Sequence, residues 1–258
     1  MPVLSPPSPP SPPRLLILGG TGEAAALARE AVARFGDRLR VTSSLAGRTK
    51  QPSPLAGDLR VGGFGGAAGL ARYLADTGVA MVIDATHPFA ATMSRHGREA
   101  CDEAHVPRLT LTRPAWRRRA GDDWILVEDA AGAARALAAQ GGRAFITIGV
   151  QDLGPFENLP GARCLVRLIE TPGRSLPFDL VTGRGPFTVA AEMRLLAERN
   201  IELLITKASG GAATRAKITA ARRLGLPVIM IRRPPLEPGP KARTIAAALE
   251  WIGVTISK

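Results

Sequence analysis

The sequence predicts an α/β protein with mostly parallel β-sheets, because short apolar runs alternate with alanine-rich stretches of helical period. The runs LLIL (15–18), MVIDA (81–85), LLIT (203–206) and VIMI (228–231) are apolar almost throughout. Strands of parallel sheets have this character because helices cover both of their faces. The alternation of such strands with helices favours right-handed crossover connections.

The expected elements can be placed along the whole chain. Strands are expected at 15–18, 39–43, 59–61, 81–85, 108–112, 125–127, 144–148, 164–169, 179–181, 203–206 and 228–231. In the first helix Leu27, Ala28, Ala31, Val32 and Phe35 form one apolar stripe, after which Gly36 is placed to end the helix. A last helix, over about 242–251, would fit on either half of the chain.

The composition indicates two domains and an N-terminal tail. Residues 1–13 (MPVLSPPSPPSPP) are rich in proline, which favours an extended segment, and they lack the pattern of a secretory signal. The stretch TRPAWRRRAGDDW (112–124) is polar and broken by proline and glycine, so it predicts a domain junction. We therefore expect a tail over 1–13, a first α/β domain over 14–118 and a second over 119–258.

The charge of the chain favours an anionic ligand. It has 34 Lys and Arg residues against 22 Asp and Glu, a formal charge of +12. The cations are scattered, which suits a cleft that collects an anion, although a generally arginine-rich surface would give the same count. Nucleic acid is not expected as a partner, because aromatic side chains for base stacking make up only 4% of the chain. No apolar run is long enough to predict a membrane span.

The two cysteines, Cys101 and Cys164, form no CxxC pattern. This argues against both a disulfide framework and a zinc site, and it fits a reducing cytoplasm. We therefore expect a cytoplasmic protein without a bound metal, and the sequence carries no signal for a particular oligomeric state.

A glycine-rich turn follows the first expected strand. From Gly20 the sequence reads GTGEAA, which matches the G-x-G-x-x-A form of the dinucleotide-binding fingerprint. Gly20 would permit the tight turn, Gly22 would let a pyrophosphate approach the backbone, and Ala25 would allow close helix–strand packing. The alternative is a purely structural corner. The residues expected to contact a cofactor here are Gly19, Gly20, Thr21, Gly22 and Glu23.

The second strand favours NADP(H) over NAD(H). NAD-binding enzymes usually have an acidic residue there for the ribose 2′-hydroxyl. Here Ser43 and Ser44 are expected at the end of the strand and Arg48 just beyond it, so hydroxyls and a guanidinium are available for a 2′-phosphate. The alternative for Arg48 is an exposed loop cation. The first domain, 14–118, is therefore expected to bind NADPH.

The motif DATHPFA (84–90) follows the fourth strand, where residues of a parallel sheet line the ligand crevice. Thr86 is expected to contact the cofactor. His87 is expected to orient the substrate or to donate a proton, or else simply to cap the next helix, which Pro88 and Phe89 would begin.

The second half carries a candidate anion site. A buried strand ends in Lys207, and the following Ser209, Gly210 and Gly211 lead toward a helix with Thr214, Arg215 and Lys217. Backbone amides, a hydroxyl and a lysine at a helix start favour an anion, although the serine alone would satisfy such a start. The residues expected to bind substrate are His87, Arg184, Lys207, Ser209, Gly210, Gly211, Thr214 and Lys217, with Arg184 supplied by a neighbouring strand.

Taken together, these motifs resemble the precorrin-6A reductase family over about residues 14–251. They are GGTGE (19–23), SLAGRT (44–49), DATHPFA, GRGPF (183–187) and KASGG (207–211), followed by KITAAR (217–222). The resemblance implies NADPH-dependent reduction of precorrin-6A, an anionic tetrapyrrole on the route to cobalamin, to precorrin-6B. It also implies two Rossmann-like domains, with the cofactor on the first and the macrocycle in a cleft between them.

Other classes of protein fit less well. A short-chain dehydrogenase needs a tyrosine and a lysine four residues apart, but four residues after Tyr73, the single tyrosine, stands Thr77. A non-catalytic, NADP-sensing regulator with the same fold remains the alternative. Such a sensor would need no large anion site in the second half of the chain.

Overall fold

The chain forms two compact units. The structure, a computed structural model, describes residues 11–47, 54–161 and 163–257. Unit 1 consists of Met1–Arg113 together with Leu236–Lys258, and unit 2 of Pro114–Pro235. Each unit contains a six-stranded sheet in which the paired strands are parallel. The expected fold class is confirmed.

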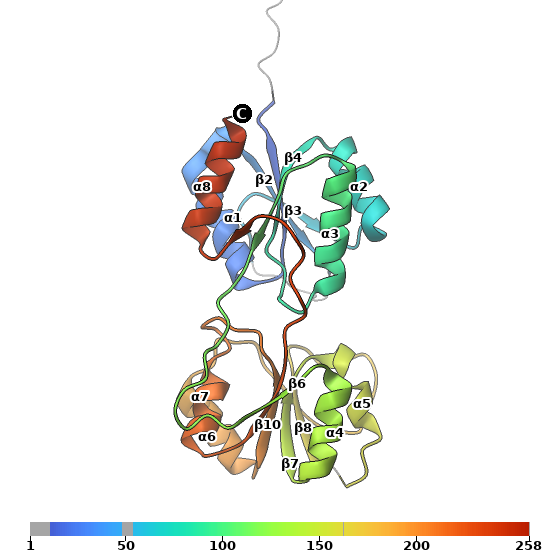
Figure 1. The fold of residues 1–258 in the computed structure, drawn as a ribbon, viewed down its shortest axis with the longest axis vertical. Helices are drawn as coiled ribbons and strands as arrows, with labels where there is room; N and C mark the ends of the chain where they lie inside the picture. Colours follow the sequence, from blue (N-terminus) through green and yellow to red (C-terminus); the bar gives the residue numbers. More distant parts are fainter. Residues whose placement is uncertain (1–10, 48–53, 162, 258) are drawn as a thin grey trace, which may run out of the picture. The chain divides into compact units, whose positions relative to one another are not determined.

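Unit 1 has the strand order of a Rossmann sheet. Its strands are β1 (Arg14–Leu18), β2 (Arg40–Leu45), β3 (Asp58–Val61), β4 (Val79–Asp84), β5 (Arg108–Leu111) and β12 (Lys241–Ala242). The order is β12-β5-β4-β1-β2-β3, so that β12 takes the sixth place in the 3-2-1-4-5-6 pattern. Helices α1 (Gly22–Phe35) and α8 (Ile245–Ile256) cover one face, and α2 (Gly66–Asp76) and α3 (Ala91–Glu103) cover the other (Figure 1).

The first helix forms as its sequence predicts. The Thr21 hydroxyl caps α1 by accepting a hydrogen bond from the amide of Ala24 at 3.1 Å. Leu27, Ala28 and Phe35 are buried on the face that packs against the sheet. The helix ends at Phe35, and Gly36 adopts a φ of 51°, a conformation that favours glycine. The α1 N-terminus is therefore fixed directly beyond β1.

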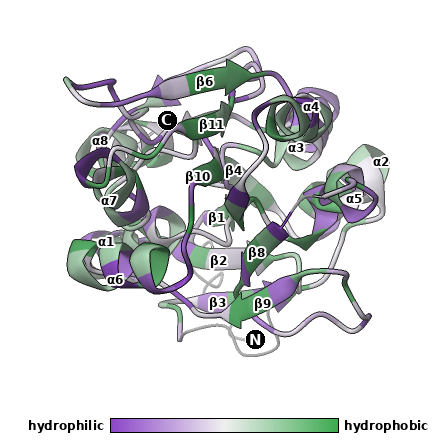
Figure 2. Cartoon of the chain, turned by 90° about the horizontal axis from the view of Figure 1, so that it is seen from below, coloured by the Kyte–Doolittle hydropathy of each residue, from purple (hydrophilic) through white to green (hydrophobic). Residues whose placement is uncertain are grey.

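Unit 2 repeats this arrangement. Its strands are β6 (Trp124–Val127), β7 (Arg143–Thr147), β8 (Arg163–Leu168), β9 (Asp179–Thr182), β10 (Leu203–Lys207) and β11 (Val228–Ile231), in the order β6-β11-β10-β7-β8-β9. Helices α4 (Ala130–Gln140) and α5 (Gly154–Glu157) lie on one face, and α6 (Val189–Glu198) and α7 (Ala216–Arg223) on the other (Figure 1). In Figure 2 strand β11 is hydrophobic along its length, whereas helices such as α7 are mixed. Short 3₁₀ turns, η1 (Gly36–Arg38) and η2 (Val150–Asp152), complete the two units.

The two units exchange their sixth strands. After β5 the chain leaves unit 1 and forms β6 and α4 in unit 2, and after β11 it returns to form β12 and α8 in unit 1. Strand β12 pairs with β5, and β6 pairs with β11. Helix α8 contacts α1, as α4 contacts α5. The chain therefore consists of two similar halves, each of which supplies the last strand and helix of the other unit.

This exchange corrects the expected domain limits. Residues 236–258 belong to the first unit and not to the second, because Lys241 is in register with Thr110 on β5. The junction lies between Arg113 and Pro114, within the stretch predicted as a junction but ahead of the expected limit at 118. Most of the expected tail, residues 1–10, lies outside the described residues.

The expected strands are all present, within two residues at each end, and β12 is an addition. The last helix begins at Ile245 and not near 242, because Lys241 and Ala242 form that strand. Within the described ranges no helix is long and apolar enough to cross a membrane. Cys101 and Cys164 are both buried and free.

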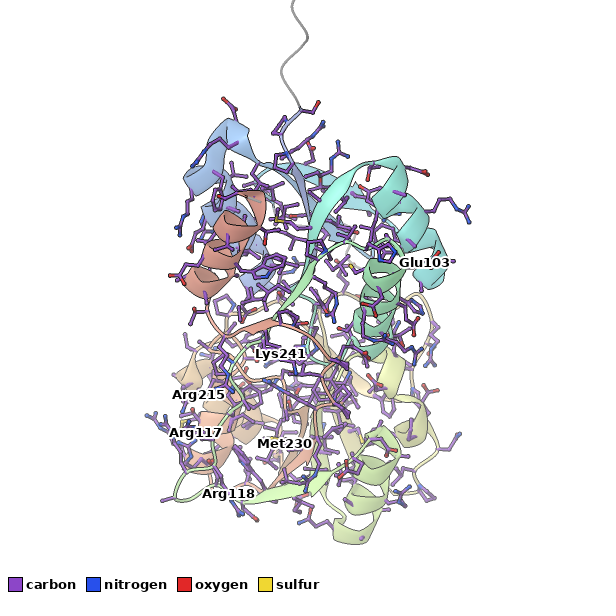
Figure 3. The ribbon with its side chains drawn as sticks, turned by 45° about the horizontal axis from the view of Figure 1, so that its top comes forward. Glu103, Arg117, Arg118, Arg215, Met230 and Lys241 are labelled. Carbon is purple, nitrogen blue, oxygen red and sulfur yellow. The ribbon has the colours of Figure 1, made fainter. Side chains whose placement is uncertain are left out.

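The densest basic run belongs to the surface of unit 2. Arg117 is exposed at the outer edge of the unit, in contrast to the buried Met230 of β11 (Figure 3). Arg118 donates to the carbonyl of Asp122 at 3.1 Å, and the amide of Arg119 donates to the Asp122 carboxylate at 2.8 Å. These arginines therefore organise the connection into β6.

Candidate functional site

The glycine-rich corner of unit 1 is held between the neighbours of β1. The amide of Gly19 donates to the carbonyl of Ser44 on β2 at 2.9 Å. The Thr21 hydroxyl donates to the carbonyl of Ala85, just beyond β4, at 2.8 Å. Because β1 lies between β2 and β4, these bonds place the corner at the point where the strand order reverses. Ligands of open α/β sheets bind in the crevice at this point.

The corner is open where a phosphate would need space. Gly20 has a φ of +101°, which strongly favours glycine, and a Cβ built on Gly20 or on Gly22 would meet no atom of the described residues within 4 Å. Gly19 is different, because its Cβ would lie 3.4 Å from the Cβ of Ala24. The amides at the start of α1 and the positive end of its dipole therefore adjoin open space. The residues present fit a dinucleotide pyrophosphate.

Glu23, the acidic member of the predicted motif, forms a salt bridge. Its carboxylate accepts a hydrogen bond from the guanidinium of Arg113, with 2.5 Å between Oε2 and Nη2. Arg113 is the last residue of unit 1 before the chain leaves for unit 2. Glu23 thus lies at the expected corner, but it forms a salt bridge there.

The hydroxyls predicted to bind the 2′-phosphate do not lie at the end of β2. The strand continues to Leu45, and Ser43 and Ser44 are both buried within it. The Ser43 oxygen is shielded from solvent and has no hydrogen-bond partner among the described residues. The prediction placed the end of the strand too early. Ser43 is a core residue, and the contact of Ser44 with the glycine corner is made by its backbone carbonyl, which accepts the hydrogen bond from Gly19. Arg48 lies outside the described residues.

The DATHPFA motif forms a turn held by a buried carboxylate. Oδ1 of Asp84 accepts hydrogen bonds from the Thr86 hydroxyl at 2.7 Å and from the Thr86 amide at 3.1 Å. Nδ1 of His87 accepts from the amide of Phe89 at 3.3 Å. Helix α3 begins only at Ala91, so residues 87–90 form a turn, and the expected helix start at Pro88 is wrong.

Unit 2 has a salt bridge at the equivalent point of its own sheet. Lys207, the last residue of β10, lies with Nζ 2.5 Å from Oδ2 of Asp152, which follows β7. The hydroxyls of Thr147 and Thr206 are joined by a hydrogen bond of 3.1 Å between the same two strands. Sequence reasoning identified Lys207 but missed Asp152. The signal was present as a single acidic residue in the glycine-containing loop after a buried strand.

The loop after Lys207 differs from the predicted anion site. The amide of Gly211 donates to the carbonyl of Pro114 at 3.2 Å, and Arg233 donates to the carbonyl of Ser209 at 2.7 Å. A Cβ on Gly210 would lie 2.2 Å from the Pro114 oxygen, so this glycine is required for close packing. Gly210 and Gly211 thus pack against Pro114, the first residue of unit 2, and α7 begins later, at Ala216. The predicted start of the helix was too early.

Thr214 and Arg184 lie apart from the Lys207 salt bridge. The Thr214 hydroxyl is 3.4 Å from the carbonyl of Gly210, to which it donates within the loop. Arg184 follows β9, which is separated from β10 by β7 and β8 and is therefore not its neighbour as predicted. Three strand spacings amount to about 14 Å. Arg184 is exposed, and its guanidinium lies 3.8 Å from the carboxylate of Glu170.

Lys217 is half-buried, and the charged groups that act on it are Glu192 and Arg167. Arg167 on β8 donates to Oε1 of Glu192 on α6 at 2.6 Å, while Oε2 of Glu192 is buried without a partner in the described structure. The Arg167 guanidinium also lies 4.0 Å from the ring centre of Phe187 in the GRGPF motif. Burial lowers the pKa of Lys217 to about 8, Glu192 opposes this shift, and Arg167 adds to it.

The lowered pKa of Lys217 predicts a pH dependence of stability. The unfolded lysine has a pKa of 10.5, so between pH 8 and 10.5 the unfolded chain binds a proton that the folded chain does not. The free energy of unfolding should therefore rise with pH across this window, by up to about 3 kcal/mol from this group. Urea unfolding at pH 7.5 and 10 should show a smaller rise in Lys217→Met than in the unmodified chain. Equal rises in both proteins would contradict the shift.

The sheets and the open corner define the class of this molecule. A Rossmann-ordered parallel sheet with a glycine corner at its switch point, joined to a second sheet of the same order, makes it a two-domain Rossmann-type α/β protein. The chain belongs to the precorrin-6x reductase CbiJ/CobK family, whose description matches residues 14–253. The family resemblance read from the motifs is confirmed.

Individual relatives agree with this assignment. The chain is 45% identical to the precorrin-6A reductase of Rhodococcus erythropolis, over 93% of this chain and 97% of the relative. It is 44% identical to that of Rhodobacter capsulatus, over 93% and 94%. It is 26% identical to the cobalt-precorrin-6A reductase of Priestia megaterium, over 87% and 92%. The solved structure of a CobK precorrin-6A reductase matches with a TM-score of 0.88 and 41% identity, covering 94% of this chain and 97% of the other.

Proposed function

We propose that this protein uses NADPH to reduce precorrin-6A to precorrin-6B in cobalamin biosynthesis. The observation that carries the proposal is the open corner at Gly20 and Gly22, at the switch point of a Rossmann sheet, in a chain whose relatives are named as reductases of this substrate. Family membership favours this activity over the alternative of a non-catalytic, NADP-sensing regulator.

The cofactor is proposed to lie along the carboxyl edge of the unit 1 sheet. Gly19–Glu23 and the start of α1 would hold the pyrophosphate through backbone amides, and Thr86 would line the crevice beyond β4. When bound, NADPH supplies the hydride for the reduction. The protein needs to add little beyond orientation and exclusion of water, which is consistent with the absence of a predicted nucleophile or metal site.

The substrate is proposed to be held by dispersed cations. Lys207 and Arg184 follow strands at the same edge of the unit 2 sheet that are three spacings, or about 14 Å, apart. Only a large ligand with several anionic groups would contact both, and the carboxylate-bearing rim of a tetrapyrrole has this character. His87 is proposed to orient the macrocycle or to donate a proton, with water as the other proton source.

The metal-free macrocycle is the favoured substrate. The relatives at 42–45% identity carry the name precorrin-6A reductase, whereas those named for cobalt-precorrin-6A are 26–28% identical. The test is anaerobic incubation of the full chain with NADPH and either precorrin-6A or its cobalt form. Loss of nicotinamide absorbance together with a change in the macrocycle spectrum is expected with the metal-free compound. NADPH binding without turnover of either compound would favour the sensing regulator.

Arg48 is proposed to bind the 2′-phosphate of NADPH. Replacing it with alanine should raise the KM for NADPH by about tenfold or more, because a guanidinium–phosphate contact is lost. The KM for NADH should hardly change, since NADH has no 2′-phosphate. Steady-state kinetics with both cofactors measure the ratio. An equal change of the KM for NADPH and for NADH would show that Arg48 does not bind the 2′-phosphate.

A further inference from the structure

The salt bridge between Glu23 and Arg113 lies at the rim of the proposed cofactor corner. Glu23 is in the first turn of α1, one residue after Gly22, and its side chain is 38% exposed. Arg113 lies two residues after the end of β5, and its side chain is only 11% exposed. Strand β5 is separated from β1 by β4, so the Arg113 side chain reaches past the carboxyl end of β4 to contact α1.

An uncompensated carboxylate at this position would oppose a phosphate. By itself Glu23 interacts favourably with the positive end of the α1 dipole, as acidic residues in a first turn generally do. The same dipole and the same amides are what a pyrophosphate would use. Two like charges within several ångströms repel each other, and they do so most at a site that is partly shielded from water. A bare Glu23 would therefore compete with the ligand for the helix terminus.

We propose that Arg113 is a positioning residue that neutralises Glu23, so that the start of α1 can accept the pyrophosphate of the cofactor. This inference rests on the proposed NADPH function. Arg113, the last residue before the chain leaves unit 1, would thus affect nucleotide binding indirectly, through its contact with Glu23. The salt bridge keeps the stabilising carboxylate at the helix terminus while removing its repulsion of the ligand.

The proposal predicts a rescue by a second substitution. In Arg113→Ala, Glu23 loses its partner, and the Kd for NADPH should rise about tenfold. In the double variant Glu23→Gln/Arg113→Ala neither charge remains, and the Kd should return to within about threefold of the unmodified chain. Glu23→Gln alone should bind NADPH as tightly as the unmodified chain or more tightly. Each Kd is measured on the full chain by titration calorimetry, without substrate.

Two comparisons separate this effect from other causes. NADPH and NADH have the same pyrophosphate, so Arg113→Ala should weaken both by the same factor, unlike Arg48→Ala. Arg40 and Asp58 form a matched pair in the same unit, 2.7 Å apart, at the amino ends of β2 and β3. Arg40→Ala should leave both dissociation constants unchanged. Thermal unfolding of each variant shows whether the fold is retained.

The outcomes distinguish this inference from the function on which it rests. Failure of the unmodified chain to bind NADPH would overturn both. Binding by the unmodified chain with an unchanged Kd in Arg113→Ala would overturn the inference and leave the proposed function in place. A weakened Arg113→Ala that Glu23→Gln does not rescue would also overturn it, because Arg113 would then act by contacting the nucleotide directly.

Discussion

Replacing Gly20 with alanine is expected to weaken NADPH binding by about a hundredfold. At a φ of +101° a Cβ is strained, so the corner has to shift or to carry the strain. If it does not shift, the methyl group projects into the open space where the pyrophosphate is proposed to lie. Either result removes the alignment between the α1 amides and the ligand. Fluorescence titration of the full chain with NADPH measures the loss.

Gly36 provides the control for this prediction. It also has a positive φ, of +51°, and its Cβ would also meet no atom within 4 Å in the described part of the chain, but it lies at the opposite end of α1. Gly36→Ala should therefore lower the melting temperature through the same kind of backbone strain while leaving the Kd for NADPH unchanged. If Gly20→Ala binds NADPH as well as Gly36→Ala does, the phosphates do not lie at this corner.

The sequence predicted the elements well because their signals are local. The apolar runs that form the strands and the stripe from Leu27 to Phe35 are each contained in a few residues. Strand β12 has only two residues, Lys241 and Ala242, and it exists because they pair with β5, far away in the sequence. Two residues are too few to show the alternation of apolar and polar side chains that would predict a strand. The exchange of sixth strands between the units was missed for the same reason.

The errors at the site also come from long-range structure. Arg184 was placed beside Lys207, but strand order is set by how the chain crosses the sheet and not by motif spacing. The Gly211 amide was expected to face a ligand, yet it bonds Pro114, almost a hundred residues earlier. Lys217 was assigned to substrate, yet its charged neighbours are Glu192 and Arg167. In contrast, the glycine corner before α1 is present as expected, because its shape depends on a few consecutive residues, and its role in binding the cofactor stays a prediction.

The two connections between the units begin next to the proposed binding sites. Both crossings start at the carboxyl end of a fifth strand, β5 or β11, which is the edge where ligands of such sheets bind. Arg113 at the first crossing contacts Glu23, and Arg233 near the second donates to the carbonyl of Ser209. The first connection is thus bonded to the helix start that is proposed to hold the cofactor, and the second to the loop that follows Lys207.

Lys207→Met is expected to raise the KM for precorrin-6A between about tenfold and a hundredfold. A hydrogen bond between a lysine and a carboxylate of the substrate is worth more than a neutral one, and methionine keeps most of the side-chain volume without the charge. Asp152 is left without its partner, but at 39% exposure it remains hydrated, so little stability should be lost. The Kd for NADPH should not change, because the cofactor is proposed to bind unit 1.

Arg163 is the matched control for Lys207. It is an exposed cation of the same sheet, at the amino end of β8 and therefore at the edge away from the proposed site. Arg163→Met should leave the KM for precorrin-6A unchanged, whereas Lys207→Arg should recover part of the loss, because the charge is restored with a different geometry. Steady-state kinetics under anaerobic conditions compare the three variants. Equal KM values for Lys207→Met and Arg163→Met would mean that net charge, and not a contact at the unit 2 switch point, recruits the substrate.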